Sequence, residues 1–264
     1  MSTLLLRLAG PMQSWGVQSR FTNRDTGLEP SKSGVIGLLC AALGRPRHAD
    51  LKDLTDLNLG VRVDRQGLLN MDYHTAGGSH RIGEKYGVAK ADGGKPDTVV
   101  SHRYYLADAD FLVGLEGDEA LLCRLDAALA RPVWPLYLGR KAFVPGSPVH
   151  LAYRPPDLPG PPEVPGLVRR PLEQALASYP WLARTSREKT RMIQKVEEER
   201  RVGRDYQLRL VLDIPFGHGA EVRPDVPLSF AERRFTLRYV RTDFTPLTAE
   251  MIQEAPHVSL PLAS

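Results

Sequence analysis

Lys32, Ser33 and Gly34 are the residues whose types and spacing most directly suggest binding chemistry. They follow Ser31 and precede an apolar run, so they lie at the expected N-terminus of a helix. Free N–H groups and the helix dipole favour an anion at such an end, and a phosphate would fit there. The serines could equally serve only as helix caps. The GxxxxGK[ST] order of a Walker motif is absent here, so this is not a nucleotide-binding P-loop.

Two adjacent basic residues lie in the segment LGRKAF. Arg140 and Lys141 follow an apolar run and precede Pro145 and Gly146. Adjacent basic side chains at the end of a strand can hold phosphates, although a solvated turn has the same residue types. The pair alone therefore leaves both interpretations open.

Trp15 lies in a connection of roughly two dozen mostly polar residues, where compact domains usually use about four to six. Arg20 and Arg24 share this connection, and loops of such length are often binding loops. The indole could stack on an unpaired base, as aromatic side chains do in single-stranded nucleic acid complexes. It could also fasten its own loop to the domain, and the sequence leaves the two roles open.

Catalytic chemistry is a weaker interpretation. A metal-independent ribonuclease needs a base for the 2′-hydroxyl and an acid for the leaving group, and Tyr73, His74 and Lys85 could supply such a trio. Nothing in their spacing requires it. A structural or RNA-contacting role is therefore the prediction for His74.

Composition limits the class of protein. The 264 residues are 42% hydrophobic, which is enough for a core and excludes a disordered chain. A net charge of +4 favours polyanionic partners without ribosomal or histone-like basicity. Without a run of about 18 apolar residues or a signal peptide, a cytoplasmic protein with no membrane partner is expected.

The spacing of Cys40 and Cys123 predicts no disulfide or metal site, and their apolar helical surroundings predict that both are buried. No cofactor is expected.

The elements that position these residues follow from apolar periodicity and capping signals. Their order, β-α-β-β-α-β with an inserted hairpin, predicts an α+β, ferredoxin-like fold with two helices on one face of an antiparallel sheet. The other face is expected to remain available for a ligand. The expected elements are strands at 3–9, 57–67, 68–78, 99–107, 110–117 and 135–153, and helices at 31–44 and 118–131.

The remainder of the chain divides into excursions and a second region. Residues 76–98 are rich in glycine and charge and predict a flexible excursion, whereas residues 154–166 form a proline-rich linker. Beyond the linker, residues 186–205 predict a solvated charged helix with pairs such as Glu197–Arg201, rather than a nucleic-acid arm. Strands at 207–215 and 233–244 are expected to pair with each other.

The combination of segments is more specific than any one of them. LRLAGPMQSWG, RFTNRDTG, PSKSGVIGLLCAALG, DYHTAGG, RYYLADADFLV and PLYLGRKAF, in this order and spacing, resemble the "Cas five" family of the repeat-associated mysterious protein (RAMP) superfamily. Members of this family are subunits of type I-E CRISPR surveillance complexes, known as Cascade. The resemblance covers about residues 3–153, while the C-terminal region looks longer than in the family.

The resemblance implies a non-catalytic, RNA-binding subunit in antiviral defence that holds the 5′ handle of the CRISPR RNA (crRNA). It implies a RAMP domain at 1–153 with a β-hairpin thumb at about 68–107, followed by a smaller region at 154–264 with a linker, a helix and strands. The implied partners are the crRNA handle, a backbone subunit at the thumb and the large PAM-reading subunit, with target DNA touched only indirectly. The alternative is an endoribonuclease that processes repeat RNA, as some type I-C relatives do. The implied RNA contacts are Gln13, Trp15, Arg20, Arg24, Lys32, Ser33, Gly34, His74, Arg81, Arg103, Arg140 and Lys141.

Overall fold

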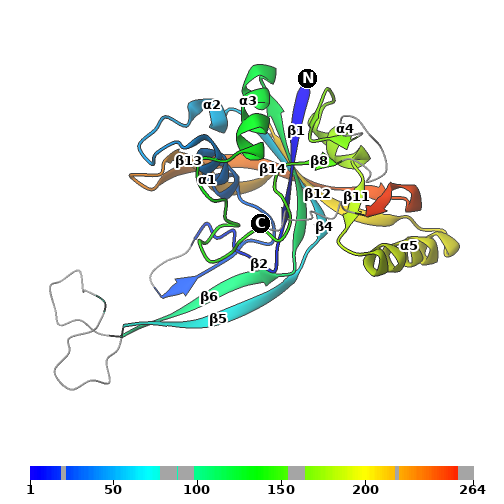
Figure 1. Ribbon diagram of the computed structural model, residues 1–264, viewed down its shortest axis with the longest axis horizontal. Helices are drawn as coiled ribbons and strands as arrows, with labels where there is room; N and C mark the ends of the chain where they lie inside the picture. Colours follow the sequence, from blue (N-terminus) through cyan, green and yellow to red (C-terminus); the bar gives the residue numbers. More distant parts are fainter. Residues whose placement is uncertain (19–21, 78–87, 89–97, 154–163, 218–219, 255–264) are drawn as a thin grey trace, which may run out of the picture.

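An antiparallel sheet of seven strands organises the structure, a computed structural model that describes residues 1–18, 22–77, 88, 98–153, 164–217 and 220–254. The strand order is β10-β1-β7-β4-β12-β14-β13, which confirms an α+β protein built on a large antiparallel sheet (Figure 1). The strands are β10 (Leu167–Val168), β1 (Ser2–Ala9), β7 (Asp110–Gly117), β4 (Asn58–Arg65), β12 (Tyr206–Ile214), β14 (Arg234–Leu247) and β13 (Glu221–Ser229).

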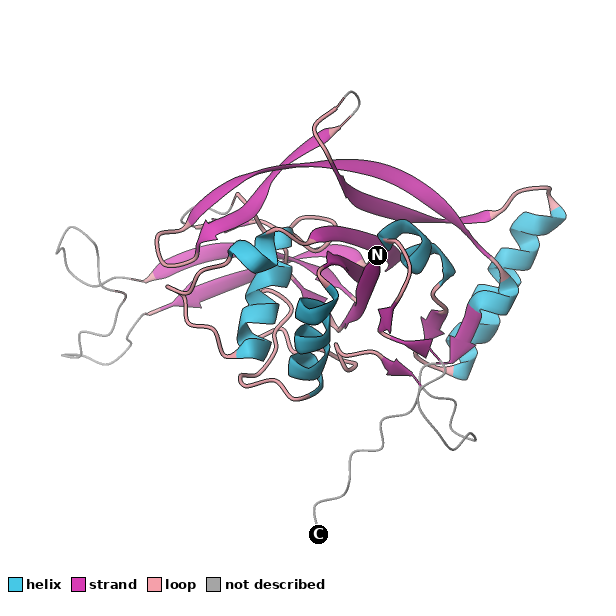
Figure 2. Cartoon of the chain, turned by 90° about the horizontal axis from the view of Figure 1, so that it is seen from above, coloured by secondary structure: helices cyan, strands magenta, loops and turns pink. Residues whose placement is uncertain are grey.

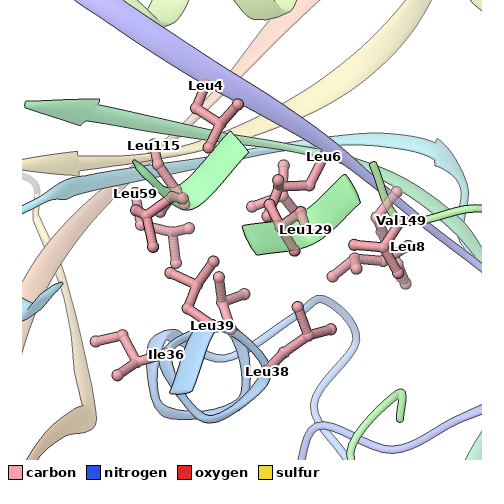
Figure 3. Packing of buried hydrophobic residues seen from close by; sticks show 14 of the residues in the cluster. Leu4, Leu6, Leu8, Ile36, Leu38, Leu39, Leu59, Leu115, Leu129 and Val149 are labelled. Carbon is pink, nitrogen blue, oxygen red and sulfur yellow. The ribbon is translucent and has the colours of Figure 1, made fainter. Parts of the chain in front are cut away.

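Two helices cover one face of this sheet, as predicted. Helix α1 (Lys32–Leu43) begins at the N-cap Ser31 and ends at Gly44, which has a φ of 69°. Helix α3 (Glu119–Ala130) begins at the N-cap Asp118. The alternation of β1 places Leu4, Leu6 and Leu8 toward these helices, where they join the largest apolar core (Figure 3). The short helix α2 (Lys52–Thr55) follows α1.

The opposite face of the sheet is not free, so the prediction of an open ligand face is wrong. Helix α4 (Leu172–Ser178) packs there against Leu5, Leu112, Leu210 and Leu212. Two glycines in the strands permit this approach. A Cβ on Gly60 would lie 2.7 Å from Leu176 Cδ1, and a Cβ on Gly114 would lie 2.6 Å from Leu172 Cδ1. Any ligand must therefore bind elsewhere.

A second sheet carries the hairpin that leaves the body of the protein. Strand β6 (Val99–Ala107) pairs with β2 (Met12–Gln13), β3 (Asn23–Arg24) and β5 (Leu68–Ala76). The predicted strands at 57–67 and 68–78 both form, but they belong to different sheets. The hairpin of β5 and β6 projects from the body (Figure 1), and most of the predicted excursion at 76–98 lies outside the described residues.

The predicted strand at 135–153 is wrong. Over this range, pairing is limited to a bridge between His150 and Leu6 and to β8 (Ala152–Tyr153), which pairs with β9 (Val164–Pro165). Prolines at 135, 145 and 148 interrupt the pattern, because proline donates no ladder hydrogen bond. β10 takes the sheet edge beside β1 instead. The boundary at 153/154 stays a prediction, although strands from both sides of it share the seven-stranded sheet.

The predicted charged helix is confirmed as α5 (Ser186–Arg201), and the predicted pairing of the C-terminal strands is confirmed as β12 with β14. Helix α5 packs beside β11 (Trp181–Ala183), the 3-10 helix η1 (Ala249–Met251) and β15 (Ile252–Glu254), which pairs in parallel with β11.

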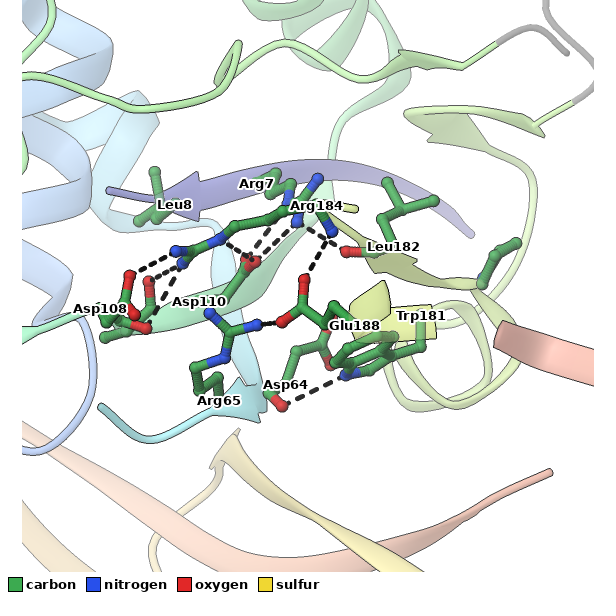
Figure 4. Close-up of polar contacts among 12 residues, drawn as sticks. Arg7, Leu8, Asp64, Arg65, Asp108, Asp110, Trp181, Leu182, Arg184 and Glu188 are labelled. Atoms are coloured by element: carbon green, nitrogen blue, oxygen red, sulfur yellow. Dashed lines mark hydrogen bonds and ion pairs between the residues drawn. The ribbon is translucent and has the colours of Figure 1, made fainter. Parts of the chain in front are cut away.

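Ion pairs fasten the start of α5 to the sheet (Figure 4). Glu188 pairs with Arg65 of β4 and accepts a hydrogen bond from the backbone N–H of Arg184. Arg7 donates to Asp110 at 2.6 Å and to the Leu182 carbonyl at 2.7 Å. The expected Glu197–Arg201 pair does not form among the described contacts.

The two cysteines differ in their surroundings. Cys40 is buried, and burial raises the pKa of its thiol to about 11. Cys123 is exposed, so the prediction that both are buried is wrong for this residue. The reason is the rotation of α3, which turns Leu122 and Leu125 inward and position 123 outward. Among the described residues, no helix is long and apolar enough to span a membrane.

Candidate nucleic-acid interface

Three arginines gather where the hairpin joins the body. Arg24 and Arg103 are neighbours because β3 pairs in parallel with β6. Arg140 reaches them from the segment after α3 and donates from Nη2 to the Arg24 carbonyl at 3.1 Å. Burial, together with the positive charges of Arg103 and Arg24, lowers the pKa of Arg140, although Asp72 and Asp25 act in the opposite direction. The cluster therefore concentrates positive charge that an anion would stabilise.

A groove opens beside this cluster. It has a volume of about 710 Å³ and runs between α1, residues 134–141 and the turn that joins β13 to β14. A smaller hollow of about 250 Å³ adjoins it and includes Arg24 and Arg140 in its wall. The two are continuous, because they share Ser33, Gly34, Gly139, Phe230 and Phe235.

The groove combines aromatic and basic side chains. Trp134 is 44% exposed, and Tyr137, Phe230 and Phe235 join it in the lining. Exposed aromatic faces beside cations are typical of sites for unpaired nucleotides, because bases stack on the rings while the cations hold phosphates. The basic residues of the lining are Arg45, Arg47, Lys141 and Arg233.

Gly139 brings the LGRK segment against the N-terminal loop. Its φ of 92° is a conformation that L side chains rarely adopt, and a Cβ there would lie 1.8 Å from the carbonyl oxygen of Ser14. The N–H of Ser14 donates to the Leu138 carbonyl at 3.1 Å. These contacts place Arg140 at the cluster and Lys141 at the groove.

Two buried residues of the predicted RNA-contacting set, Gln13 and Trp15, lie in the segment that follows β1. Gln13 donates to the carbonyls of Leu8 and Ala109, both at 2.9 Å, and accepts from Trp15 Nε1 at 3.1 Å. The indole of Trp15 is 1% exposed and lies against Gly34, where a Cβ would be 2.7 Å from the ring. Neither side chain is accessible to a ligand here. Of the two roles that the sequence left open for Trp15, the structure favours fastening the loop.

The N-terminus of α1 holds an anion that belongs to the protein itself. The Asp225 carboxylate accepts from the backbone N–H of Lys32 at 2.8 Å and from Arg238 Nε at 2.6 Å. Lys32 is buried, and its Nζ pairs with Asp213 at 3.0 Å. The expected phosphate position is therefore filled internally, and Lys32 joins the helix to the C-terminal strands. Ser33 is half-buried and reaches the groove.

Replacing Asp225 with asparagine tests this internal site. We expect the free energy of unfolding to fall by about 1.5–3 kcal/mol, because Arg238 loses a charged hydrogen-bond partner in a buried setting. Denaturant unfolding of the full chain measures the change. Glu232→Gln is the control, since its pair with Arg234 is exposed and should contribute less than about 1 kcal/mol. Equal stability of the two variants would contradict the role assigned to Asp225.

The remaining predicted residues belong to the hairpin or lie outside the description. His74 lies on β5, with Nδ1 3.6 Å from Asp72 Oδ2. Arg103 donates from Nε to Ser101 Oγ at 3.0 Å. Arg20 and Arg81 fall outside the described residues, as does Lys85. Among the described residues, no cluster of histidine, cysteine and acidic side chains could hold a metal ion.

Several groove residues were missed from the sequence. Trp134 and Tyr137 lie six and three positions before Arg140, so the WPLYLGRK segment offered a local signal for them. No local signal connects Phe230, Arg233 and Phe235 with that segment, because they come from the distant β13–β14 turn and the start of β14. The other missed residues are Arg45 and Arg47, of which Arg45 is paired with Asp53.

Comparisons with known proteins agree with one another. A model of the family described as CRISPR-associated protein (Cas_Cas5) matches residues 3–241. The chain is 36% identical over 155 residues to the CRISPR system Cascade subunit CasD of Escherichia coli (strain K12). That alignment covers 53% of this chain and 66% of the relative, slightly less than two thirds of its length.

Two solved structures extend the similarity over nearly the whole chain. One, described as the crystal structure of a Cas protein, is 41% identical with a TM-score of 0.66 and covers 96% of this chain and 99% of the other. The second belongs to a CRISPR RNA-guided surveillance complex. It is 34% identical with a TM-score of 0.71 and covers 97% of this chain and 95% of the other.

Proposed function

Because the chain belongs to the CRISPR-associated protein family Cas_Cas5, we propose that it is a non-catalytic subunit of a Cascade-type surveillance complex. Its task there is to hold the 5′ handle of the crRNA. The observation that carries this proposal is the groove, where exposed aromatic rings adjoin the cluster of Arg24, Arg103 and Arg140. A single-stranded, partly unstacked RNA needs both kinds of contact.

The proposed contacts divide by chemistry. Arg24, Arg103, Arg140 and Lys141 hold phosphates, and Ser33 offers a hydroxyl. Bases stack on the exposed rings of Trp134 and Phe235. Of the remaining predicted residues, Trp15 and Gly34 line the smaller hollow, and Gln13 and Lys32 are buried in internal contacts. Arg20, His74 and Arg81 remain proposed contacts.

The hairpin is the proposed thumb that contacts a backbone subunit. Strand β5 exposes large apolar side chains, and exposed apolar patches often mark protein interfaces. Those side chains are Leu68, Leu69, Met71 and Tyr73. A contact with the large PAM-reading subunit and a cytoplasmic location complete the proposal.

The proposal includes a ferredoxin-like RAMP arrangement in residues 1–153. It is supported by the chain order β1, α1, β4, β7, α3 and by a sheet in which β7 lies between β1 and β4. The short β10 occupies the place of the final strand. Because β10 lies beyond residue 153, the proposed second region, residues 154–264, would supply the last strand of this arrangement.

Co-expression with the genomic neighbours and a CRISPR array tests the assembly. We expect the chain to co-purify with the other subunits and with crRNA, and we expect the purified complex to protect the 5′ handle from nuclease. Recovery of the chain alone and free of RNA would contradict the proposal.

A cleavage assay separates this function from the endoribonuclease alternative. Tyr73 lies edge-on to the ring of His102, with centroids 5.5 Å apart, so the thumb holds residues that could act on RNA. We expect labelled repeat RNA to stay intact when it is incubated with the purified protein in EDTA. Cleavage within the repeat that is lost in His74→Ala would establish the alternative instead.

A further inference from the structure

Helix α5 carries three cations along one side. Arg187, Arg191 and Lys195 follow one another at intervals of four residues, and all three are exposed. Four residues of helix advance about 6 Å and make slightly more than one turn, so the cations form a slanting stripe on one face. The opposite side of the helix packs into the protein through Ile193 and Val196. The stripe therefore faces outward.

These cations have no partner within the described part of the protein. None of the three makes a hydrogen bond or ion pair with another described residue. Other charged residues of α5 are paired: Glu188 binds Arg65, and Glu199 binds Arg204. Glu198 is also exposed and lies beyond Lys195 on the same side of the helix. The stripe thus keeps its positive charge at its N-terminal end.

From the spacing, the exposure and the missing partners, we infer that this stripe binds the phosphate backbone of a nucleic-acid duplex. Evenly spaced cations complement a regular array of phosphates. Helix α5 contains no aromatic residue, and single-stranded binding relies on aromatic stacking. A duplex backbone needs only charge and hydrogen-bond donors, so it is the occupant that this surface fits.

The stripe is separate from the groove. Figures 1 and 2 both place α5 at the end of the molecule away from the hairpin that borders the arginine cluster. The ion pairs of Figure 4 hold the start of α5 on the sheet, so the stripe is presented on a fixed element. The inference departs from two expectations from the sequence: that residues 186–205 form a solvated helix rather than a nucleic-acid arm, and that this chain touches target DNA only indirectly.

The test compares two probes with the full-length chain: a short mixed-sequence DNA duplex and a short single-stranded RNA with the handle sequence. We expect the triple variant Arg187→Gln, Arg191→Gln, Lys195→Gln to bind the duplex at least about tenfold more weakly at low salt. Three lost contacts should reduce the slope of log K against log salt by about 2.7. Binding of the single-stranded RNA should be unchanged.

A control variant with the same net charge makes the result specific. Lys52→Gln, Arg169→Gln, Arg241→Gln also removes three exposed cations, each of which has an ion-pair partner away from α5. The control should keep wild-type duplex binding. The inference is overturned if the wild type does not bind the duplex, if the stripe variant binds it normally, or if the control loses as much.

Discussion

The triple variant Arg24→Gln, Arg103→Gln, Arg140→Gln is expected to bind the crRNA handle about 100- to 1000-fold more weakly than the wild type. This loss corresponds to about 3–4 kcal/mol, which is reasonable for three charged hydrogen-bond donors. The three side chains gather at one point, and the pKa of Arg140 is lowered there by burial and by the charges of Arg103 and Arg24. A phosphate in the site would remove that repulsion.

Titration of the handle RNA at several salt concentrations measures this effect. For a single strand, each lost phosphate contact reduces the salt slope by about 0.7, so a change of about 2 is expected. The Lys52, Arg169 and Arg241 control variant should keep both the affinity and the slope. Unchanged handle binding by the arginine variant would place the RNA somewhere other than this groove.

Replacing Trp15 with alanine should lower the free energy of unfolding by about 3–5 kcal/mol. The indole is fully enclosed in the main core, so its removal leaves a large cavity. The change also leaves Gln13 Oε1 without its hydrogen-bond donor and removes the indole ring that packs against Gly34. The loop that borders the arginine cluster would lose its anchor.

A second tryptophan provides the matched comparison. Trp134 is exposed in the groove, so Trp134→Ala should change stability by less than about 1 kcal/mol. If a base stacks on it, this variant should lose about 1–3 kcal/mol of RNA affinity. Denaturant unfolding of both variants measures the change in stability, and titration with RNA measures the change in affinity. A Trp15→Ala protein with wild-type stability and weakened RNA binding would reverse the two roles.

The elements with strong local signals were predictable from the sequence. Strand β1 follows from alternating leucines, and α1 follows from Ser31, an apolar stripe and Gly44. Capping and periodicity depend on residues within a few positions of one another, so the chain shows them directly. The LGRK segment is likewise local and leads to Arg140, whereas Trp134 was missed although the WPLYLGRK segment offered a local signal for it.

The accessibility of each side chain depended on distant partners. The sequence suggested Lys32 as a phosphate ligand. In the structure its Nζ pairs with Asp213 and its backbone N–H donates to Asp225, and both aspartates lie more than 180 residues later in the chain. The sheet face that was predicted to be open is covered by α4. The edge strand beside β1 is β10 and not the predicted strand at residues 135–153.

Composition, periodicity and motif order thus determine the family, the main helices and most strands, because these properties reside in neighbouring residues. Tertiary structure decides which cations remain unpaired. Lys32 is neutralised by residues from another region of the chain, whereas Arg24, Arg103 and Arg140 are brought together with too few acids to balance them. A charge binds a ligand only if folding leaves it without an internal partner, and that pairing is set by contacts between residues far apart in the sequence.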